Sequence, residues 1–171
     1  MKLSGQATAA ATQELAKTSK NLTFRELGNT GLHTSILGFG TYRVSIESDY
    51  HRQALEEALL SGINLIDTSS NYTNGNAERL IGEVLSEFIA NHQLRRDQII
   101  VVSKAGYIQG ENIDIWEAIK EAPEAWKDVL EIESGLAHCI HPTFLKDQIT
   151  NSLDRLQMDC IDCYLLHNPE A

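Results

Sequence analysis

The sequence predicts an α/β fold in which short strands alternate with helices. Two observations indicate this class: compact apolar runs typical of buried strands recur along the chain, and segments with apolar residues at helical spacing follow them. The 171 residues, 42% of them apolar, are sufficient for one domain with a packed core. Such alternation predicts a parallel sheet covered by helices, either open and doubly wound or closed as a barrel.

The first β/α unit is preceded by a predicted hairpin. Residues 24–27 and 32–35 flank a Gly-Asn-Thr-Gly turn, a pattern typical of two antiparallel strands. Residues 36–41 form a compact apolar stretch that suits a buried strand. A polar residue at 48–49 can then cap an amphipathic helix, which Gly62 is placed to end.

The same order of elements continues along the chain. Strands are predicted at residues 63–68, 99–104 and 160–167, and helices with one apolar face at residues 80–88 and 145–156. The chain therefore holds about four β/α units. The alternative of an open dinucleotide-binding sheet loses support, because the Gly-Phe-Gly that ends the first strand lacks the third glycine of the expected loop.

Residues 107–142 are predicted to form an insertion at the mouth of the fold. This acidic stretch is too long for a structureless loop in a compact domain, so we expect one or two short helices within it. Its two tryptophans, Trp116 and Trp126, can either line a substrate pocket or pack the insertion against the scaffold. Packing is the expected role, since buried aromatic side chains usually serve it.

Residues 1–21 are predicted to be a disordered leader, because they contain almost no large apolar side chains. An organelle transit peptide is the alternative, although arginine is absent from the segment. No stretch approaches the roughly 20 apolar residues of a membrane span. The net charge of −10 argues against nucleic-acid and anionic-membrane partners, so we expect a soluble, cytoplasmic protein.

Three cysteines are too few for a disulfide framework and fit reduced thiols. Cys160 and Cys163 form a C-x-x-C pair within a predicted strand, with histidines nearby. Positions three apart on a strand point to opposite faces, so the two thiolates cannot share one ion. We therefore expect no metal site.

Three ionisable residues stand at the carboxyl ends of predicted strands: Asp67, Lys104 and His167. A fourth, Tyr72, lies five residues beyond the aspartate. Each alone could simply pair with loop amides, but in parallel β/α sheets the carboxyl ends of the strands form the functional face. A lysine ammonium favours the phenolate of a neighbouring tyrosine, an aspartate holds the lysine, and a histidine can orient a carbonyl oxygen. Such a group suits proton delivery to an oxygen.

Longer motifs surround these residues. Residues 67–82 fit the pattern D-T-A/S-x-x-Y-x-x-G-x-A/S-E-x-x-I/L-G, and residues 162–167 fit D-x-x-x-L-H. Together with Val-Ser-Lys at 102–104 and the opening hairpin, the chain from about residue 22 onward resembles the aldo-keto reductase family. The resemblance implies NADPH-dependent reduction of an aldehyde or ketone to an alcohol. Tyr72 would be the general acid, Lys104 and Asp67 would adjust the pKa of its phenol, and His167 would orient the substrate.

The resemblance also implies a cofactor site. In the family, the Gly-Thr that ends the first barrel strand approaches NADPH, which makes Gly40, Thr41 and Tyr42 candidate cofactor-binding residues. Asp67 would lie near the nicotinamide ribose, and Asn168 is a candidate at the edge of the cofactor.

The implied fold is the N-terminal half of a (β/α)₈ TIM barrel with an N-terminal β-hairpin, occupying residues 22–171. A complete barrel typically needs about 250 residues, and its phosphate site is commonly built after strands seven and eight. Half a barrel leaves sheet edges unpaired, so we expect an isolated chain to self-associate, to pair with a complementary C-terminal half, or to be inactive. The alternative function is a non-catalytic half-barrel that serves in interaction or oligomerisation.

Overall fold

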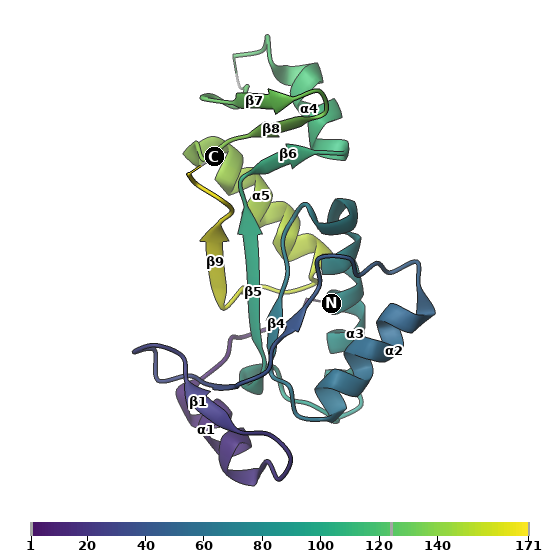
Figure 1. Ribbon diagram of the computed structural model, residues 1–171, viewed down its shortest axis with the longest axis vertical. Coiled ribbons are helices and arrows are strands. Elements are labelled where there is room, and N and C mark those ends of the chain that lie inside the picture. The colour runs from purple at the N-terminus through teal and green to yellow at the C-terminus, as the bar shows by residue number, and fades with distance from the viewer. Residues whose placement is uncertain (1, 124, 171) are drawn as a thin grey trace.

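The computed structural model describes residues 2–123 and 125–170, and it confirms the α/β class (Figure 1). Four parallel strands follow one another in sequence order across the main sheet. They are β3 (Phe39–Gly40), β4 (Leu65–Asp67), β5 (Ile100–Ala105) and β9 (Cys163–Leu166). Three predicted strands are shorter than expected. The apolar stretch at 36–41 pairs only near its end, since Ile36 and Leu37 are exposed. The strand predicted at 63–68 spans only 65–67, and the last strand begins at 163 rather than 160.

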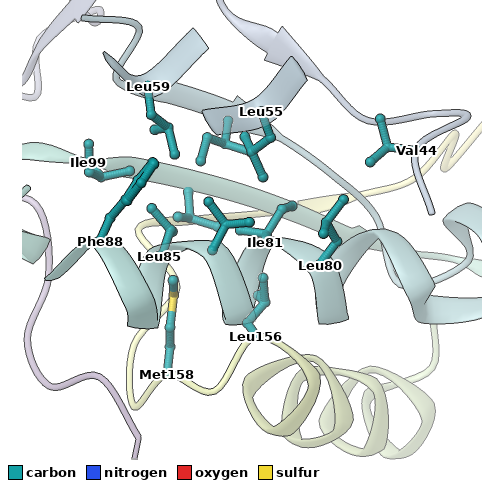
Figure 2. Packing of buried hydrophobic residues seen from close by; sticks show 13 residues of the cluster. Val44, Leu55, Leu59, Leu80, Ile81, Leu85, Phe88, Ile99, Leu156 and Met158 are labelled. Atoms are coloured by element: carbon teal, nitrogen blue, oxygen red, sulfur yellow. The ribbon is translucent and has the colours of Figure 1, made fainter. Parts of the chain in front are cut away.

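Three helices cover one face of this sheet: α2 (Asp49–Leu60), α3 (Asn76–Ala90) and α5 (Pro142–Arg155). The central α3 contributes more residues to the core than any other element, because its apolar residues recur at helical spacing. Figure 2 shows them packed between α2 and the segment that follows α5. The main cluster comprises Val44, Leu55, Leu59, Ile66, Leu80, Ile81, Val84, Leu85, Phe88, Ile99, Val101, Leu156 and Met158.

The opposite face of the sheet is covered at one end by the N-terminal region. The predicted hairpin is present as β1 (Phe24–Glu26) and β2 (His33–Ser35), paired antiparallel. Ile100 and Val102 of β5 are buried beneath this region, against Ala7 and neighbouring leucines. Two 3₁₀ turns, η1 (Tyr72–Gly75) and η2 (Arg96–Gln98), complete the connections. Among the helices of the described ranges, none is long and apolar enough to cross a membrane.

The prediction of a disordered leader is wrong for residues 2–21. Residues Ala9–Thr18 form helix α1, which Thr8 caps by accepting a hydrogen bond from the backbone of Ala11. Leu3 exchanges backbone hydrogen bonds with the segment after α5, at 2.7 and 3.0 Å. The composition argument failed because this segment is anchored by main-chain hydrogen bonds and by small buried side chains, which need few large apolar residues. Met1, the first residue of the predicted leader, lies outside the described residues.

The insertion holds one helix, α4 (Glu111–Ile119), and a three-stranded antiparallel sheet that the sequence analysis missed. Its strands are β6 (Tyr107–Gln109), β7 (Leu130–Glu133) and β8 (Leu136–His138), in the order β6-β8-β7. Such short strands leave no alternating pattern to recognise, and all four residues of β7 are exposed. Two further residues lie outside the described ranges: Glu124, which is within the predicted insertion, and Ala171, which is within the predicted domain at 22–171.

The tryptophans of the insertion serve packing. Trp126 is buried, lies edge-on to Phe144 of α5 with ring centroids 4.8 Å apart, and donates a hydrogen bond to Asp147 at 2.7 Å. Trp116 packs at the border of the same cluster. These contacts attach the insertion to α5, beside the carboxyl end of the main sheet (Figure 1).

Candidate active site

The four predicted catalytic residues converge at the carboxyl end of the parallel sheet. Asp67 is the last residue of β4, Lys104 is the penultimate residue of β5, and His167 directly follows β9. Tyr72 opens the η1 turn in the loop after β4. Because the three strands are adjacent and parallel, their ends meet at one edge, which brings together residues as far apart in the sequence as Asp67 and His167.

Lys104 is at the centre of the group. Its Nζ donates to a carboxylate oxygen of Asp67 at 2.7 Å and to the carbonyl oxygen of Thr68 at 2.8 Å. The third contact of Nζ is with the phenolic oxygen of Tyr72 at 3.4 Å. The lysine side chain is 13% exposed whereas that of Asp67 is 42% exposed. The ammonium is therefore held inside the site with its charge directed at the phenol.

His167 lies on the other side of Tyr72. The two rings meet edge to face, with centroids 5.8 Å apart. Burial first, and the charge of Lys104 second, lower the pKa of His167 below its usual value. The imidazole is therefore neutral at physiological pH.

The predicted cofactor-binding residues lie in two places. Gly40 pairs with Asp67 across the sheet, and a Cβ added to it would meet nothing within 4 Å. Thr41 is buried, and both its backbone N–H and its hydroxyl donate to the carbonyl oxygen of Asp67 at 3.0 Å. Tyr42 is 67% exposed and its ring meets that of Tyr72 at 5.4 Å. Gly40, Thr41 and Tyr42 therefore form an open rim beside Asp67.

Asn168 lies on the insertion side of the site. Its backbone has a positive φ of 47°, and its side-chain amide donates to the phenolic oxygen of Tyr107 at 2.9 Å. The ring of Tyr107 in turn meets that of His167 edge to face at 4.9 Å. The insertion is therefore in direct contact with the candidate catalytic group.

A cavity of about 330 Å³ opens between these two sides. Sequence reasoning missed several residues of its wall, since Tyr107, Gln109 and Leu136 come from the insertion, whose pairing has no local signal. The wall consists of Tyr42, Asn71, Tyr72, Tyr107, Gln109, Leu136, His167 and Asn168. A pocket of this size with aromatic walls and a few polar groups suits a small organic molecule.

No cluster of three or more metal-binding side chains occurs in residues 2–123 and 125–170. Of the C-x-x-C pair, Cys163 opens β9 while Cys160 precedes that strand, and both thiols are free. The ionisable side chains at the site are those of Tyr72, Lys104, Asp67 and His167, and a phenol beside an ammonium can give a proton to an oxygen.

Known proteins resemble this chain in both sequence and structure. The sequence profile of the Aldo/keto reductase family matches residues 36–171. The NADH-specific methylglyoxal reductase of Escherichia coli (strain K12) is 28% identical over 149 residues, which are 82% of this chain and 40% of that protein. The uncharacterized oxidoreductase YqkF of Bacillus subtilis (strain 168) is 30% identical over 143 residues, which are 84% of this chain and 38% of that protein.

Among solved structures, the holo form of aldo-keto reductase AKR11C1 from Bacillus halodurans superimposes with a TM-score of 0.64 at 28% identity. The match covers 87% of this chain and 43% of that protein. A putative aldo-keto reductase from Pseudomonas aeruginosa gives a TM-score of 0.57 at 26% identity, over 85% of this chain and 47% of the other. The chain thus spans about two fifths of the length of the curated relatives it matches.

Proposed function

Because the chain belongs to the aldo/keto reductase family, we propose that its site reduces an aldehyde or a ketone to an alcohol by hydride transfer from a nicotinamide cofactor. The strands and helices match part of an aldo-keto reductase TIM barrel. The observation that carries the proposal is the position of the Lys104 ammonium, which contacts both the carboxylate of Asp67 and the phenol of Tyr72.

In this proposal Tyr72 is the proton donor. As hydride reaches the carbonyl carbon, the carbonyl oxygen takes the proton of the phenol, and an alcohol and a phenolate result. The ammonium of Lys104, 3.4 Å from the phenolic oxygen, stabilises the charge that develops there. Asp67 keeps that ammonium in place, and His167 orients the substrate beside the phenol. The phenolate regains its proton from solvent before the next turnover.

A bound nicotinamide cofactor would supply the hydride, and Gly40, Tyr42 and the carboxylate of Asp67 would hold its nicotinamide end at the open rim. Thr41 supports this rim from below through its two hydrogen bonds to Asp67. Resemblance to the family favours NADPH, while one relative is named as NADH-specific. Both cofactors therefore belong in the test.

A second function, a half-barrel that serves in association, is favoured by a specific observation. β3 and β9 are the outer strands of the sheet, and apolar side chains next to them are exposed. Leu165 and Leu166 of β9 are 41% and 46% exposed, and Ile36 and Leu37 before β3 are 54% and 58% exposed. A second copy, or a complementary C-terminal half, would cover such edges.

The test is a titration of the purified protein with NADPH and, separately, NADH, followed by turnover of a generic aldehyde. Saturable binding with turnover supports the reductase, and Tyr72→Phe is expected to abolish turnover while cofactor binding remains. Tyr50→Phe is the matched control, because Tyr50 is 83% exposed on α2, outside the site. Retention of full activity by Tyr72→Phe would contradict the proposed mechanism.

Oligomer size, measured in the same samples by light scattering, separates the second function from the first. A defined oligomer that binds neither cofactor favours the association module. A defined oligomer that turns over the aldehyde means that pairing completes the active site.

A further inference from the structure

We propose that Gln109 of the insertion is a specificity-determining residue, whose side-chain amide oxygen accepts a hydrogen bond from a hydroxyl group that the substrate carries away from its carbonyl. Gln109 ends β6 and lines the cavity of about 330 Å³ beside Tyr72. It also lines a neighbouring cavity of about 260 Å³ on the side of Arg43 and Thr73. The inference deepens the proposed function and rests on it for its kinetic consequence.

The register of β6 directs Gln109 toward the site. Successive side chains of a strand point to opposite faces, so Tyr107 and Gln109 share one face while Ile108 points to the other. Ile108 is fully buried in the apolar cluster that attaches the insertion to α5. Pairing with β8 places Leu136 opposite Gln109, and Leu136 lines the same cavity. The buried anchor on one face of β6 therefore fixes which of its side chains reach the cavity.

Close packing also holds the end of β6 against the loop that carries Tyr72. Gly110, the next residue, has a positive φ of 56°, and a Cβ added to it would overlap the side-chain amide of Asn74. Glycine permits both this backbone conformation and this close approach. The Nε2 atom of Gln109 donates a long hydrogen bond to the main-chain carbonyl oxygen of Asn71 at 3.5 Å. Gln109 therefore contacts the residue that directly precedes the proposed proton donor.

The contact with Asn71 leaves the amide oxygen of Gln109 as an acceptor. Because Nε2 is directed at a carbonyl oxygen, Oε1 lies on the other side of the amide carbon, and it accepts no hydrogen bond from any residue that the structure describes. An amide oxygen accepts hydrogen bonds and donates none. The substrate group that it recognises must therefore carry a proton, as a hydroxyl group does and a methyl or carboxylate group does not.

The other walls of the cavity favour an uncharged, flat substrate. Tyr42, Tyr72, His167 and Tyr107 line it with rings, and successive rings in this series meet edge to face. Three amide side chains and one leucine complete the wall, so within the described ranges it offers an anion no cationic partner. A hydroxylated ring can pack on the aromatic walls and donate to Gln109. The substrate class that follows is an uncharged aromatic aldehyde or ketone that bears a hydroxyl group.

The direct test is NMR on ¹⁵N-labelled protein, titrated with meta-hydroxybenzyl alcohol in the absence and in the presence of NADP⁺. The comparison ligand is meta-methylbenzyl alcohol, in which a methyl group of similar size replaces the ring hydroxyl. The side-chain NH₂ signals of Gln109 are identified by their loss in Gln109→Met, which keeps the length of the side chain. In the wild-type protein these signals should shift saturably with the hydroxylated alcohol. Backbone signals should show that it binds about tenfold more tightly than the methyl compound, as expected for one hydrogen bond.

The two alcohols should bind with equal affinity to Gln109→Met. Gln53→Met is the matched control, because Gln53 is exposed on α2, outside the site, and this variant should keep the tenfold difference. Equal affinities in the wild-type protein, or a difference that persists in Gln109→Met, overturn the proposal. It is overturned as well if neither alcohol binds saturably.

Kinetics separate the inference from the proposed function. The ratio of kcat/KM for meta-hydroxybenzaldehyde to that for meta-methylbenzaldehyde should fall about tenfold in Gln109→Met and stay constant in Gln53→Met. If neither aldehyde is reduced while the affinities of the alcohols depend on Gln109, the proposed function fails and the assignment of Gln109 stands. If both aldehydes are reduced and the ratio is unchanged in Gln109→Met, the assignment of Gln109 fails and the function stands.

Discussion

Gly82 of helix α3 lies where that helix meets the end of α5, and replacement by alanine should destabilise the fold. A Cβ at this position would lie 2.7 Å from the carbonyl carbon and oxygen of Leu156 and 2.8 Å from the carbonyl oxygen of Arg155. Ordinary contacts of a Cβ fall between 3.4 and 4 Å. The neighbours are main-chain atoms, so no side-chain rotation relieves the overlap, and α3 must move away from α5 by several tenths of an ångström or more.

The expected magnitude is the difference between two opposing effects. Overpacking of a core typically costs about 1–3 kcal/mol, and contact with rigid backbone places Gly82→Ala at the upper end. Alanine gains back about 1 kcal/mol over glycine through its better helix propensity. The free energy of unfolding should therefore fall by about 2 kcal/mol, which lowers Tm by roughly 4–8 °C in a protein of this size.

The assay is thermal and urea unfolding followed by circular dichroism. Ser86→Ala is the matched control on the same helix, because its buried hydroxyl has no partner among the described residues. That variant gains about 0.5 kcal/mol of helix propensity and loses an unsatisfied polar group, so its stability should be equal to or above that of the wild type. A Gly82→Ala protein as stable as Ser86→Ala would refute the steric argument.

Three further predictions follow from the charged groups. Lys104→Met should lower kcat about a thousandfold or more. An ammonium 3.4 Å from a developing phenolate stabilises its charge by up to about 5 kcal/mol at an effective dielectric constant near 20. An unchanged kcat would exclude this role of the lysine. NMR titration should find the pKa of His167 below that of an exposed histidine and higher in Lys104→Met, because the lysine charge is one cause of the lowering. Because the folded pKa is lowered, the unfolded chain binds this proton more readily than the folded one. The contribution of His167 to the free energy of unfolding is therefore fully present above the unfolded pKa near 6.5, and it is lost as pH falls through the lower folded pKa. A free energy of unfolding that rises on acidification from pH 7 would contradict this sign. Arg155→Met should lower the free energy of unfolding in urea by about 3–5 kcal/mol, because the fully buried Glu78 loses its ionic partner at 2.7 Å. The control Arg52→Met breaks only partly exposed ion pairs, so it should lower the free energy of unfolding by about 1 kcal/mol or less.

Much of the fold was predictable because its signals are local. The helical spacing of apolar residues on α2 and α3 marks which side of each helix is buried, whatever it packs against. On α5 the apolar spacing marks a half-buried face, whereas the buried residues of that helix are Phe144, Gln148 and Ser152. The convergence of Asp67, Lys104 and His167 was also accessible, since residues at the carboxyl ends of adjacent parallel strands must share one edge. Tyr72 joined them because it belongs to the loop that begins at Asp67.

The errors share one physical cause, which is dependence on contacts between distant segments. The segment at residues 2–21 is anchored by main-chain hydrogen bonds from Leu3 to residues 157–159 and from Thr8 to Asp97. The strands of the insertion exist only because they pair with one another. Neither contact leaves a periodic pattern in its own segment.

The same distinction holds within the candidate site. The sequence by itself determined which side chains could transfer a proton and at which end of the sheet they stand. Only the tertiary structure decided that the buried hydroxyl of Ser69 faces the imidazole of His167 and that the ring of Tyr107 packs against it. The same holds for His138, whose Nε2 donates to the main-chain carbonyl oxygen of His167. A hydrogen bond is directional and acts over about 3 Å, so its partners are settled only when segments far apart in the chain have packed together.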